Sequence, residues 1–486
     1  MNNYNEFLYL PPEDVVSGVN PFSKALRSIL AGFALWIIKL NFINLNYILP
    51  LLGILLIFTG FRSLRKENKW FSACFFISIF LLFEFSSSLI INTTIYHKEI
   101  YSMPFMTVLS VVSIFLSFAL FFAFGEGIKA VQKKADLPQG AGGIKALITW
   151  YAVLCALALL NYKGIIIGII MVVAFIFILI SLYDLSKALD EAGYTITPPV
   201  LKVPNWLICS LISFTIVAGG ICSYAIWGKY NMQWEEHTPP EAESTKLHLA
   251  SLGFPKEVLN DLTASDLIDC SDALDVKTVT KLHPMNKGRE VITTEIISGR
   301  KTYIHSTVYD QKELLLTSVA VKLPGERETW KVFHHFRWEI TPQFYGTECI
   351  RIIPAYTYGY NHGWSDGGNI SAQLLYDLDS VTYASSFHLL GKQIRTADDM
   401  FFGESTSEDI YGAFSFPCNG TNHRGYICYT TAVNQPGWMF SSWIDYSHKL
   451  PCVEYPNETA LDNTLKGFLD KSDAFISAQD ALQFRP

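Results

Sequence analysis

The sequence predicts a polytopic α-helical membrane domain of about seven spans, followed by an extracytoplasmic, mainly β domain of the antiparallel sandwich type with short flanking helices. Two observations support this prediction. Apolar segments fill the first 227 of the 486 residues and then stop, and the polar, aromatic-rich remainder alternates with period two. We expect a transmembrane helical domain over residues 1–229, a linker over 230–245 and a β-rich domain over 246–486.

Five segments are long and apolar enough to cross a bilayer, because each approaches the roughly 20 residues that a ~30 Å hydrocarbon core requires. Backbone groups inside lipid must pair within their own segment, so these spans are helices. Two earlier segments are less regular, since residues 22–38 begin with Lys24 and Arg27 and residues 47–61 contain Pro50. These two either cross fully or form a hairpin that enters from one side. The five clear segments are 71–91, 105–124, 144–160, 164–183 and 206–227.

Basic residues in the short loops indicate the orientation of the chain. With a cytoplasmic N-terminus and seven crossings, twelve Lys and Arg residues lie on the cytoplasmic side and three, Lys39, Lys98 and Lys163, lie on the other. Residues 1–20 contain no basic residue and do not resemble a cleavable signal peptide. The pattern predicts a multi-pass plasma-membrane protein with a cytoplasmic N-terminus and an extracellular C-terminal domain.

The net charge changes sign where the apolar segments end. Residues 1–227 carry a net charge of +4 and the remaining residues carry −11. A nucleic-acid-binding domain needs a basic surface that releases counterions, so the acidic second half argues against nucleic acid as a partner. The lipid bilayer is the partner that the first half requires, and no residue pattern indicates a cofactor.

Glu84 lies in the middle of an apolar segment and is followed by three serines, Ser86 to Ser88. A carboxylate at that depth is costly unless it is paired or protonated, so Glu84 is a candidate for a proton or substrate pathway. The alternative is that Glu84 makes a polar contact between packed helices. The small serines would let these helices approach each other closely.

Three segments resemble uncharacterised multipass membrane proteins of Gram-positive bacteria. They are residues 46–64, which look like the first hairpin of such proteins, and residues 425–431 and 440–448 in the second half. Together they cover about a tenth of the chain. The resemblance implies a bacterial plasma membrane and no particular activity.

The second half contains ten short runs that are rich in β-branched and aromatic residues and mostly separated by Gly, Asp, Asn or Pro. Such spacing predicts an antiparallel sandwich or barrel-like sheet. Short helices are expected after Pro255, after Thr263 or Ser265, and over the amphipathic segments 458–469 and 478–484. The predicted strands are 291–298, 302–309, 314–323, 330–340, 350–357, 370–376, 381–389, 411–416, 425–433 and 438–446.

Five of the nine cysteines follow residue 227, and two of them invite a disulfide. Cys418 and Cys428 flank a turn-rich segment, and a hairpin there would bring their Cα atoms within the roughly 4.4–6.8 Å that a bridge requires. A bridge between Cys349 and Cys452 is a second option. The alternative is that these thiols are free and buried, as expected in a bacterium that forms few disulfides.

The histidines do not predict a metal site. His334 and His335 are adjacent on a predicted strand, so their side chains point to opposite faces of the sheet and cannot bind one ion. No metal-ligand spacing such as H-x-x-x-H with an intervening Glu occurs.

The glycine-rich segment 359–369 and the strand that leads into it form the best candidate for a ligand site. Glycines let the backbone approach a ligand. Alternate tyrosines would form a ladder on one face that suits stacking against a carbohydrate or an extended peptide. The alternative is a tyrosine-rich core face that ends in an ordinary turn. The candidate ligand-binding residues are Tyr356, Tyr358, Tyr360, His362, Trp364, Asp366 and Asn369.

No catalytic motif is present, and three functions remain open. The first is a membrane protein that displays a ligand-binding or sensing β domain without enzyme activity. The second is a membrane-tethered hydrolase acting on wall glycan or peptide, and the third is a transporter or channel accessory that uses Glu84. The acidic residues on which a glycosidase pair could draw are Glu339, Glu348, Asp366 and Asp377.

Overall fold

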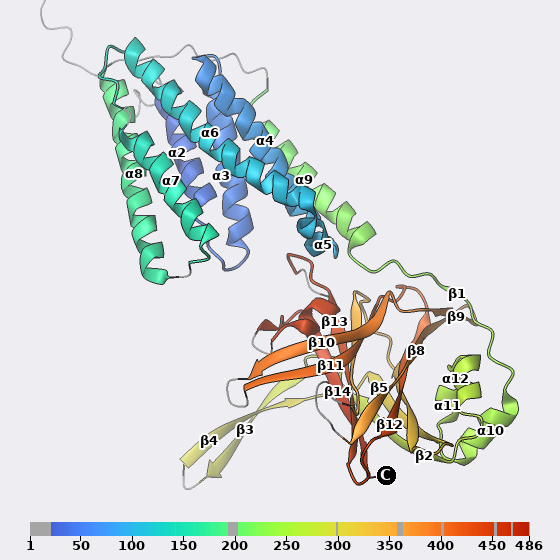
Figure 1. The fold of residues 1–486 in the computed structure, drawn as a ribbon. Helices are drawn as coiled ribbons and strands as arrows, with labels where there is room; N and C mark the ends of the chain where they lie inside the picture. Colours follow the sequence, from blue (N-terminus) through green and yellow to red (C-terminus); the bar gives the residue numbers. More distant parts are fainter. Residues whose placement is uncertain are drawn as a thin grey trace, which may run out of the picture. The chain divides into compact units, whose positions relative to one another are not determined.

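The computed structural model describes residues 21–485, apart from 141, 163, 193–202, 298–299, 357–362, 400–402, 452–453 and 468–469. The chain divides into two compact units, Met1–Tyr224 and Ala225–Pro486. The first consists of helices and the second is mainly antiparallel β-sheet (Figure 1).

The helices of the first unit form an antiparallel bundle, and six of those described are long and apolar enough to cross a membrane. The first apolar segment of the sequence forms the helix Pro21–Ile37, which has 17 residues and is one residue shorter than the 18 that we require of a spanning helix. The helices are α2 (Pro21–Ile37), α3 (Leu45–Leu64), α4 (Lys69–Ile91), α5 (His97–Ser102), α6 (Pro104–Lys134), α7 (Gly142–Leu159), α8 (Ile165–Glu191) and α9 (Asn205–Trp227); the six are α3, α4 and α6 to α9.

Glycines allow two of these helices to pack closely. A Cβ atom added to Gly32 of α2 would lie 2.7 Å from the carbonyl oxygen of Gly53 in α3, and one added to Gly53 would lie 2.6 Å from the carbonyl oxygen of Gly32. Small residues at such crossings are typical of helices packed within a bilayer, where backbones must approach closely. The aromatic core beside this crossing contains Phe33, Phe61 and Phe124.

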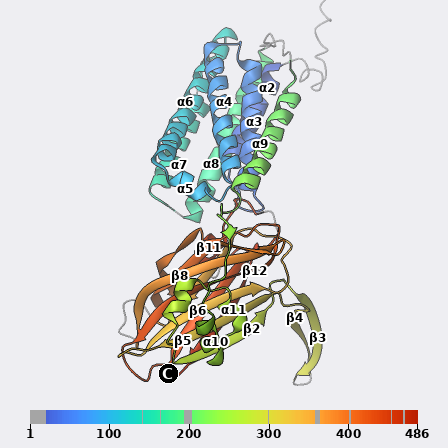
Figure 2. The same cartoon turned by 90° about the vertical axis from the view of Figure 1, so that its right-hand side faces the viewer.

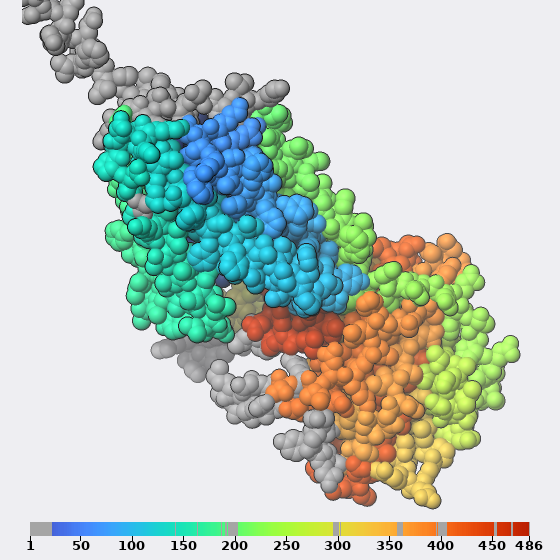
Figure 3. All heavy atoms as spheres, turned by 45° about the horizontal axis from the view of Figure 1, so that its top comes forward, coloured from blue at the N-terminus to red at the C-terminus, as the bar shows by residue number. Residues whose placement is uncertain are grey.

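The outward faces of the same bundle are apolar. Figure 3 shows the surface that α4 and α6 present, and both helices expose large apolar side chains along it. In water such a surface would be unfavourable, whereas hydrocarbon solvates it. The exposed rings on these two helices include Phe76, Phe83, Phe105, Phe115 and Phe122.

Two facing antiparallel sheets form the body of the second unit (Figures 1 and 2). The larger has the order β1-β9-β8-β12-β6-β5-β2, and the smaller has the order β10-β11-β7-β13-β14. The strands of the larger sheet are β1 (Glu235–Glu236), β2 (Asp275–His283), β5 (Leu314–Leu323), β6 (Thr329–Trp338), β8 (Trp364–Leu378), β9 (Val381–Ser385) and β12 (Thr421–Val433). Those of the smaller sheet are β7 (Glu348–Ile353), β10 (Leu389–Asp399), β11 (Gly403–Phe414), β13 (Phe440–Lys449) and β14 (Phe475–Phe484).

A separate hairpin and a helical cap complete this unit. Strands β3 (Arg289–Ile297) and β4 (Arg300–Val308) pair only with each other. Helices α10 (Glu243–Ser251), α11 (Lys256–Leu259) and α12 (Ala264–Asp269), which we call the helical cap, cover the outer face of the larger sheet (Figure 1). Leu249 and Phe254 of the cap pack there against Phe333 and Tyr426.

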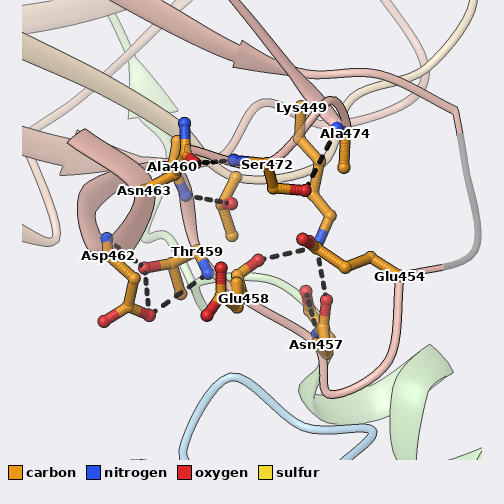
Figure 4. Close-up of polar contacts among 12 residues, drawn as sticks. Lys449, Glu454, Asn457, Glu458, Thr459, Ala460, Asp462, Asn463, Ser472 and Ala474 are labelled. Carbon is orange, nitrogen blue, oxygen red and sulfur yellow. Dashed lines mark hydrogen bonds and ion pairs between the residues drawn. The ribbon is translucent and has the colours of Figure 1, made fainter. Parts of the chain in front are cut away.

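The last helix, α13 (Ala460–Leu465), lies next to a buried lysine (Figure 4). Thr459 begins the helix with a capping box, in which its hydroxyl accepts from the Asp462 amide at 3.0 Å and Asp462 accepts from the Thr459 amide at 3.2 Å. Lys449 is buried and donates to the side-chain oxygen of Asn457 and the carbonyl oxygen of Glu458, both at 2.6 Å. This lysine therefore fixes the chain that leads into α13.

Three expectations about the second unit need correction. Residues 478–484 belong to β14 and not to a helix, because they pair with the edge of β13, a contact that local amphipathicity does not reveal. The expected linker 230–245 contains β1, and its Trp234 packs against Tyr376 with ring centroids 4.8 Å apart, so this segment is part of the folded unit. Strand β2 follows the helical cap in a region where we expected none.

Candidate functional site

The predicted aromatic ladder does not form a binding face where the structure describes it. Tyr356 and Trp364 are buried in the core between the sheets. Tyr356 packs edge-to-face on Tyr429, and the indole nitrogen of Trp364 donates to the carbonyl oxygen of Met439 at 3.3 Å. Buried rings cannot stack on a ligand, so these two residues have a packing role, which is the alternative that the sequence left open.

The remaining residues of that candidate site are divided between an exposed strand and the undescribed segment. Asp366 and Asn369 lie at the exposed beginning of β8, where Asp366 accepts from the amide of Gly368 at 2.9 Å and forms an ion pair with Lys392. Tyr358, Tyr360 and His362 lie outside the described residues. Among the described residues, the ammonium of Lys392 that pairs with Asp366 also lies 5.4 Å from the centroid of the Tyr356 ring.

Glu84 makes a contact between helices. Its carboxylate accepts a hydrogen bond from the hydroxyl of Ser113, which joins α4 to α6. Glu84 is half-buried, and this geometry fits the packing alternative. A role in a proton or substrate pathway stays a hypothesis.

The Cys418–Cys428 bridge is not formed. Both residues are free thiols, because the segment between them enters β12 at Thr421 and continues extended past Cys428 in place of turning back as a hairpin. Cys418 is exposed, whereas Cys428 is buried beneath the helical cap. Cys452, the partner of Cys349 in the second option, lies outside the described residues.

His334 and His335 point to opposite faces of β6, as predicted. His334 lies between the sheets, with one ring nitrogen 2.8 Å from the hydroxyl of Ser318 and the other 2.8 Å from that of Ser442. His335 lies under the helical cap, where its Nε2 is 2.9 Å from Asp261. No group of three potential metal ligands comes together among the residues that the structure describes.

A pocket of about 700 Å³ opens instead at one end of the sandwich. We call it the end pocket. Its walls are the segments that follow β2, β4 and β6 and the end of β13, and this volume lies in the range of small-molecule sites. The lining residues with polar side-chain groups include Asn286, Arg289, Glu313, Trp338, Thr341, Gln343 and His448.

Hydrogen bonds hold one wall of the end pocket in place. The carboxylate of Glu313 accepts from the amide of Met285 at 2.6 Å and from the side chain of Asn286 at 2.5 Å. Arg289 forms an ion pair with Asp310 at 2.9 Å. These contacts join the β2–β3 connection to the β4–β5 connection, so the wall is formed without a ligand.

The floor of the pocket is a histidine held by a buried carboxylate. His448 in β13 stands directly opposite Glu348 in β7, and its Nδ1 lies 2.7 Å from Glu348 Oε1. Both side chains are almost fully buried. The ring of Trp338 packs edge-to-face against His448 with centroids 5.0 Å apart, and its indole nitrogen donates to the Tyr446 hydroxyl at 3.1 Å.

The electrostatic environment of this pair defines what the imidazole can do. Burial raises the pKa of Glu348, and the adjacent His448 opposes that shift. The Nδ1 atom of His448 faces Glu348, and Nε2 has no hydrogen bond among the described residues, so a neutral imidazole with its proton on Nδ1 would offer Nε2 as an acceptor. Such a nitrogen can accept a hydrogen bond from a ligand hydroxyl or amide, or take a proton from water.

Sequence reasoning named Glu348 only as one of several acidic residues and did not identify His448 or Trp338. The strand pairing that places His448 opposite Glu348 joins residues a hundred positions apart, and no local motif records it. Both residues lie just outside the predicted strands 350–357 and 438–446, so the sequence pattern gave no signal for the pair.

Comparisons with known proteins add no functional assignment. No known family matches this chain, and no curated protein matches it. It is similar to a solved structure described as "AvmM Catalyzes Macrocyclization in Alchivemycin A Biosynthesis", with 10% identity over 40% of this chain and 96% of that chain and a TM-score of 0.15. A TM-score this low supports no conclusion about fold or activity.

Proposed function

We propose that this chain is a multi-pass plasma-membrane protein whose second unit lies outside the cytoplasm and binds a hydroxyl- or amide-bearing ligand, such as wall glycan or peptide, in the end pocket. The observation that carries the proposal is a preformed pocket of about 700 Å³ with the carboxylate-held His448 on its floor. Ligand sites commonly combine an apolar surface with a few fixed polar groups in this way.

The membrane location is supported by the helices of the first unit. Six of those described are long and apolar enough to span, and their outward faces carry large apolar side chains. Basic residues gather in the α3–α4 connection and in the last turn of α6, which favours the cytoplasm for those loops and the outside for the second unit.

The choice of ligand follows from the groups that line the end pocket. Trp338 supplies an apolar ring surface, because its nitrogen is already bonded to Tyr446. His448 supplies a hydrogen-bond acceptor, and Asn286 and Gln343 supply amides. Sugars and peptides both combine apolar faces with many hydroxyl or amide donors, which matches this lining.

A filling substitution tests the proposal on the full-length protein in detergent. Thr341 is exposed at the rim, so Thr341→Trp should obstruct the pocket without disturbing the core. We expect wild-type protein to bind wall glycan or peptide fragments in calorimetric titrations and the variant to lose at least tenfold in affinity. Thr396→Trp, at an exposed position of β10 that does not line the pocket, is the matched control. Equal binding by all three proteins would exclude the end pocket as the site.

Hydrolysis of the bound ligand is the second candidate function, and the Glu348–His448 pair favours it. In this reaction His448 Nε2 would take a proton from water as the water attacks a carbonyl carbon, and it would return that proton to the leaving group as the bond from the carbonyl carbon breaks. His448→Gln would then abolish product release while retaining part of the binding. Product formation that is unchanged in His448→Gln would exclude this role.

A further inference from the structure

A groove in the first unit has an apolar length and a cationic end. It lies between α2 and α8, has a volume of about 450 Å³ and is lined by Arg27, Leu30, Ala31 and Ala34 from α2 and Ile176, Leu179, Ile180 and Tyr183 from α8. We call it the α2–α8 groove. Each set follows the spacing i, i+3, i+4, i+7, so it forms one face of its helix.

The shape of the groove follows from small residues on one side. Because the helices are antiparallel, Arg27 lies beside Tyr183 at one end, and Ala31 and Ala34 extend from there along the aliphatic residues of α8. The small side chains of these alanines leave space between the helices, which a leucine or isoleucine at the same positions would fill. The result is an apolar depression between the two helices that an alkyl chain can occupy.

Two cations flank one ring at the end of the groove. The guanidinium of Arg27 lies 5.5 Å from the centroid of the Tyr183 ring, and the ammonium of Lys187 lies 5.3 Å from it. Lys24 precedes Arg27 by one turn on the same face of α2. All three cations are exposed, and none of them forms an ion pair with a carboxylate among the described residues. Asp184, which directly follows Tyr183 in the sequence, is an exposed carboxylate at this end of the groove.

We infer that the α2–α8 groove is a binding site for an anionic phospholipid, with the phosphate on Arg27 and Lys187 and one acyl chain along Ala31 and Ala34. An amphiphile with one negative headgroup matches both the apolar length and the cations Arg27 and Lys187 at its end, whereas a neutral alkyl chain would match only the first. Basic pockets between spanning helices on the cytoplasmic side are known to hold anionic headgroups. This inference rests on the proposed membrane location.

Native mass spectrometry of the full-length protein with a mixture of phosphatidylglycerol and phosphatidylcholine of equal chain length tests the inference. We expect wild-type protein to retain phosphatidylglycerol preferentially. Arg27→Ala with Lys187→Ala should reduce its retention by about 25-fold, since one Lys or Arg near an anionic surface contributes roughly fivefold. The control Lys66→Ala with Lys133→Ala removes two exposed cations that do not line the groove, and it should leave retention unchanged.

Two further arms separate the headgroup from the acyl chain. Ala31→Trp fills the groove and should lower phosphatidylglycerol retention with all cations present, whereas Ala146→Trp at an exposed position of α7 should not. Soluble glycerol phosphate at millimolar concentration should not displace the lipid. Displacement by glycerol phosphate, or equal retention by the groove and control variants, would overturn the inference.

A parallel carbonate extraction distinguishes this outcome from failure of the proposed membrane location. Protein that stays in the membrane fraction but shows no headgroup preference would refute the lipid site alone. Protein that is released by carbonate would refute the membrane location on which the lipid site rests.

Discussion

Buried histidines are the residues whose ionisation most clearly affects the second unit. His334 lies between the two sheets with hydroxyl partners on both ring nitrogens, and burial lowers its pKa to about 3. His423 contacts the Tyr345 hydroxyl at 2.7 Å, and burial lowers its pKa to about 4. Both rings are therefore neutral in the folded protein across most of the acidic range.

This leads to a pH dependence of stability with a definite sign. Above the unfolded histidine pKa of about 6.5, His334 is neutral in both states and contributes no dependence. As the pH falls below that value, the unfolded chain binds a proton that the folded chain refuses. The free energy of unfolding should then decrease by about 1.4 kcal/mol per pH unit for this group until the folded pKa is reached.

Urea titrations of residues 225–486 between pH 7 and pH 4 measure the effect. His334→Gln removes the titrating group, so its stability should depend less steeply on pH than that of wild-type protein, whatever its stability at pH 7. His305→Gln, at an exposed position of β4, should keep the wild-type slope. A His334→Gln slope equal to that of wild type would contradict the assignment.

The aromatic residues near the glycine-rich segment support the fold and not a binding face. Trp364→Ala and Tyr356→Ala each leave a cavity in the core between the sheets, so each should cost about 3–5 kcal/mol of unfolding free energy. Asn369→Ala, on the exposed part of β8, should change it by less than about 0.5 kcal/mol. Thermal unfolding distinguishes the two groups. If Trp364→Ala and Tyr356→Ala were as stable as the wild-type protein, the packing role of these two rings would be wrong.

At the scale of elements, a buried ionic network joins the helical cap to the larger sheet. Asp266 of α12 forms an ion pair with Lys331 of β6 at 2.7 Å and accepts from the Tyr426 hydroxyl at 2.5 Å and the Ser371 hydroxyl at 2.6 Å. These hydrogen bonds lower the pKa of Asp266 although its burial alone would raise it. The cap is therefore fixed by charge as well as by its apolar contacts.

Removing this carboxylate should destabilise the second unit strongly. Asp266→Ala leaves Lys331 buried with only the partly exposed Asp269 as its partner, so we expect a loss of about 3–5 kcal/mol. Asp275→Ala breaks a pair with Lys277 in which both side chains are 43% exposed, and it should cost less than about 1 kcal/mol. Chemical denaturation compares them, and equal losses would show that the buried pair does not fix the cap.

At the scale of the whole molecule, basic residues near the ends of the helices favour the proposed position of the second unit outside the cytoplasm. The α3–α4 connection contains Arg65 and Lys66, and the end of α6 contains Lys133 and Lys134. These positions keep the same side whether or not α2 crosses fully. The predicted orientation of the second unit therefore does not depend on whether the first two segments cross fully or form a hairpin.

Reporter fusions test this topology at three positions. A tag at Asp136 should report the cytoplasm, and a tag after Pro486 should report the outside. A tag at Met1 should report the cytoplasm, whether the first two segments cross fully or form a hairpin that enters from one side. Protection of the C-terminal tag from protease in intact, wall-stripped cells would contradict the proposed orientation.

The sequence by itself determined the division of the chain and the main type of each half. Apolar length is a local property, so it revealed the helices of the first unit, and period-two alternation revealed strands such as β5, β6 and β13. Local pattern failed where pairing partners decided the outcome. Residues 478–484 have an amphipathic spacing, yet they form a strand because the edge of β13 accepts them.

Only the tertiary structure decided which side chains form a site. Tyr356 and Trp364 alternate as a binding ladder would, but the facing sheet buries them. His448 has no local motif, yet the register of β13 against β7 places it on Glu348, and the converging loops turn that pair into the floor of a pocket. Period and composition are encoded in neighbouring residues, whereas burial and register depend on contacts between residues far apart in the chain.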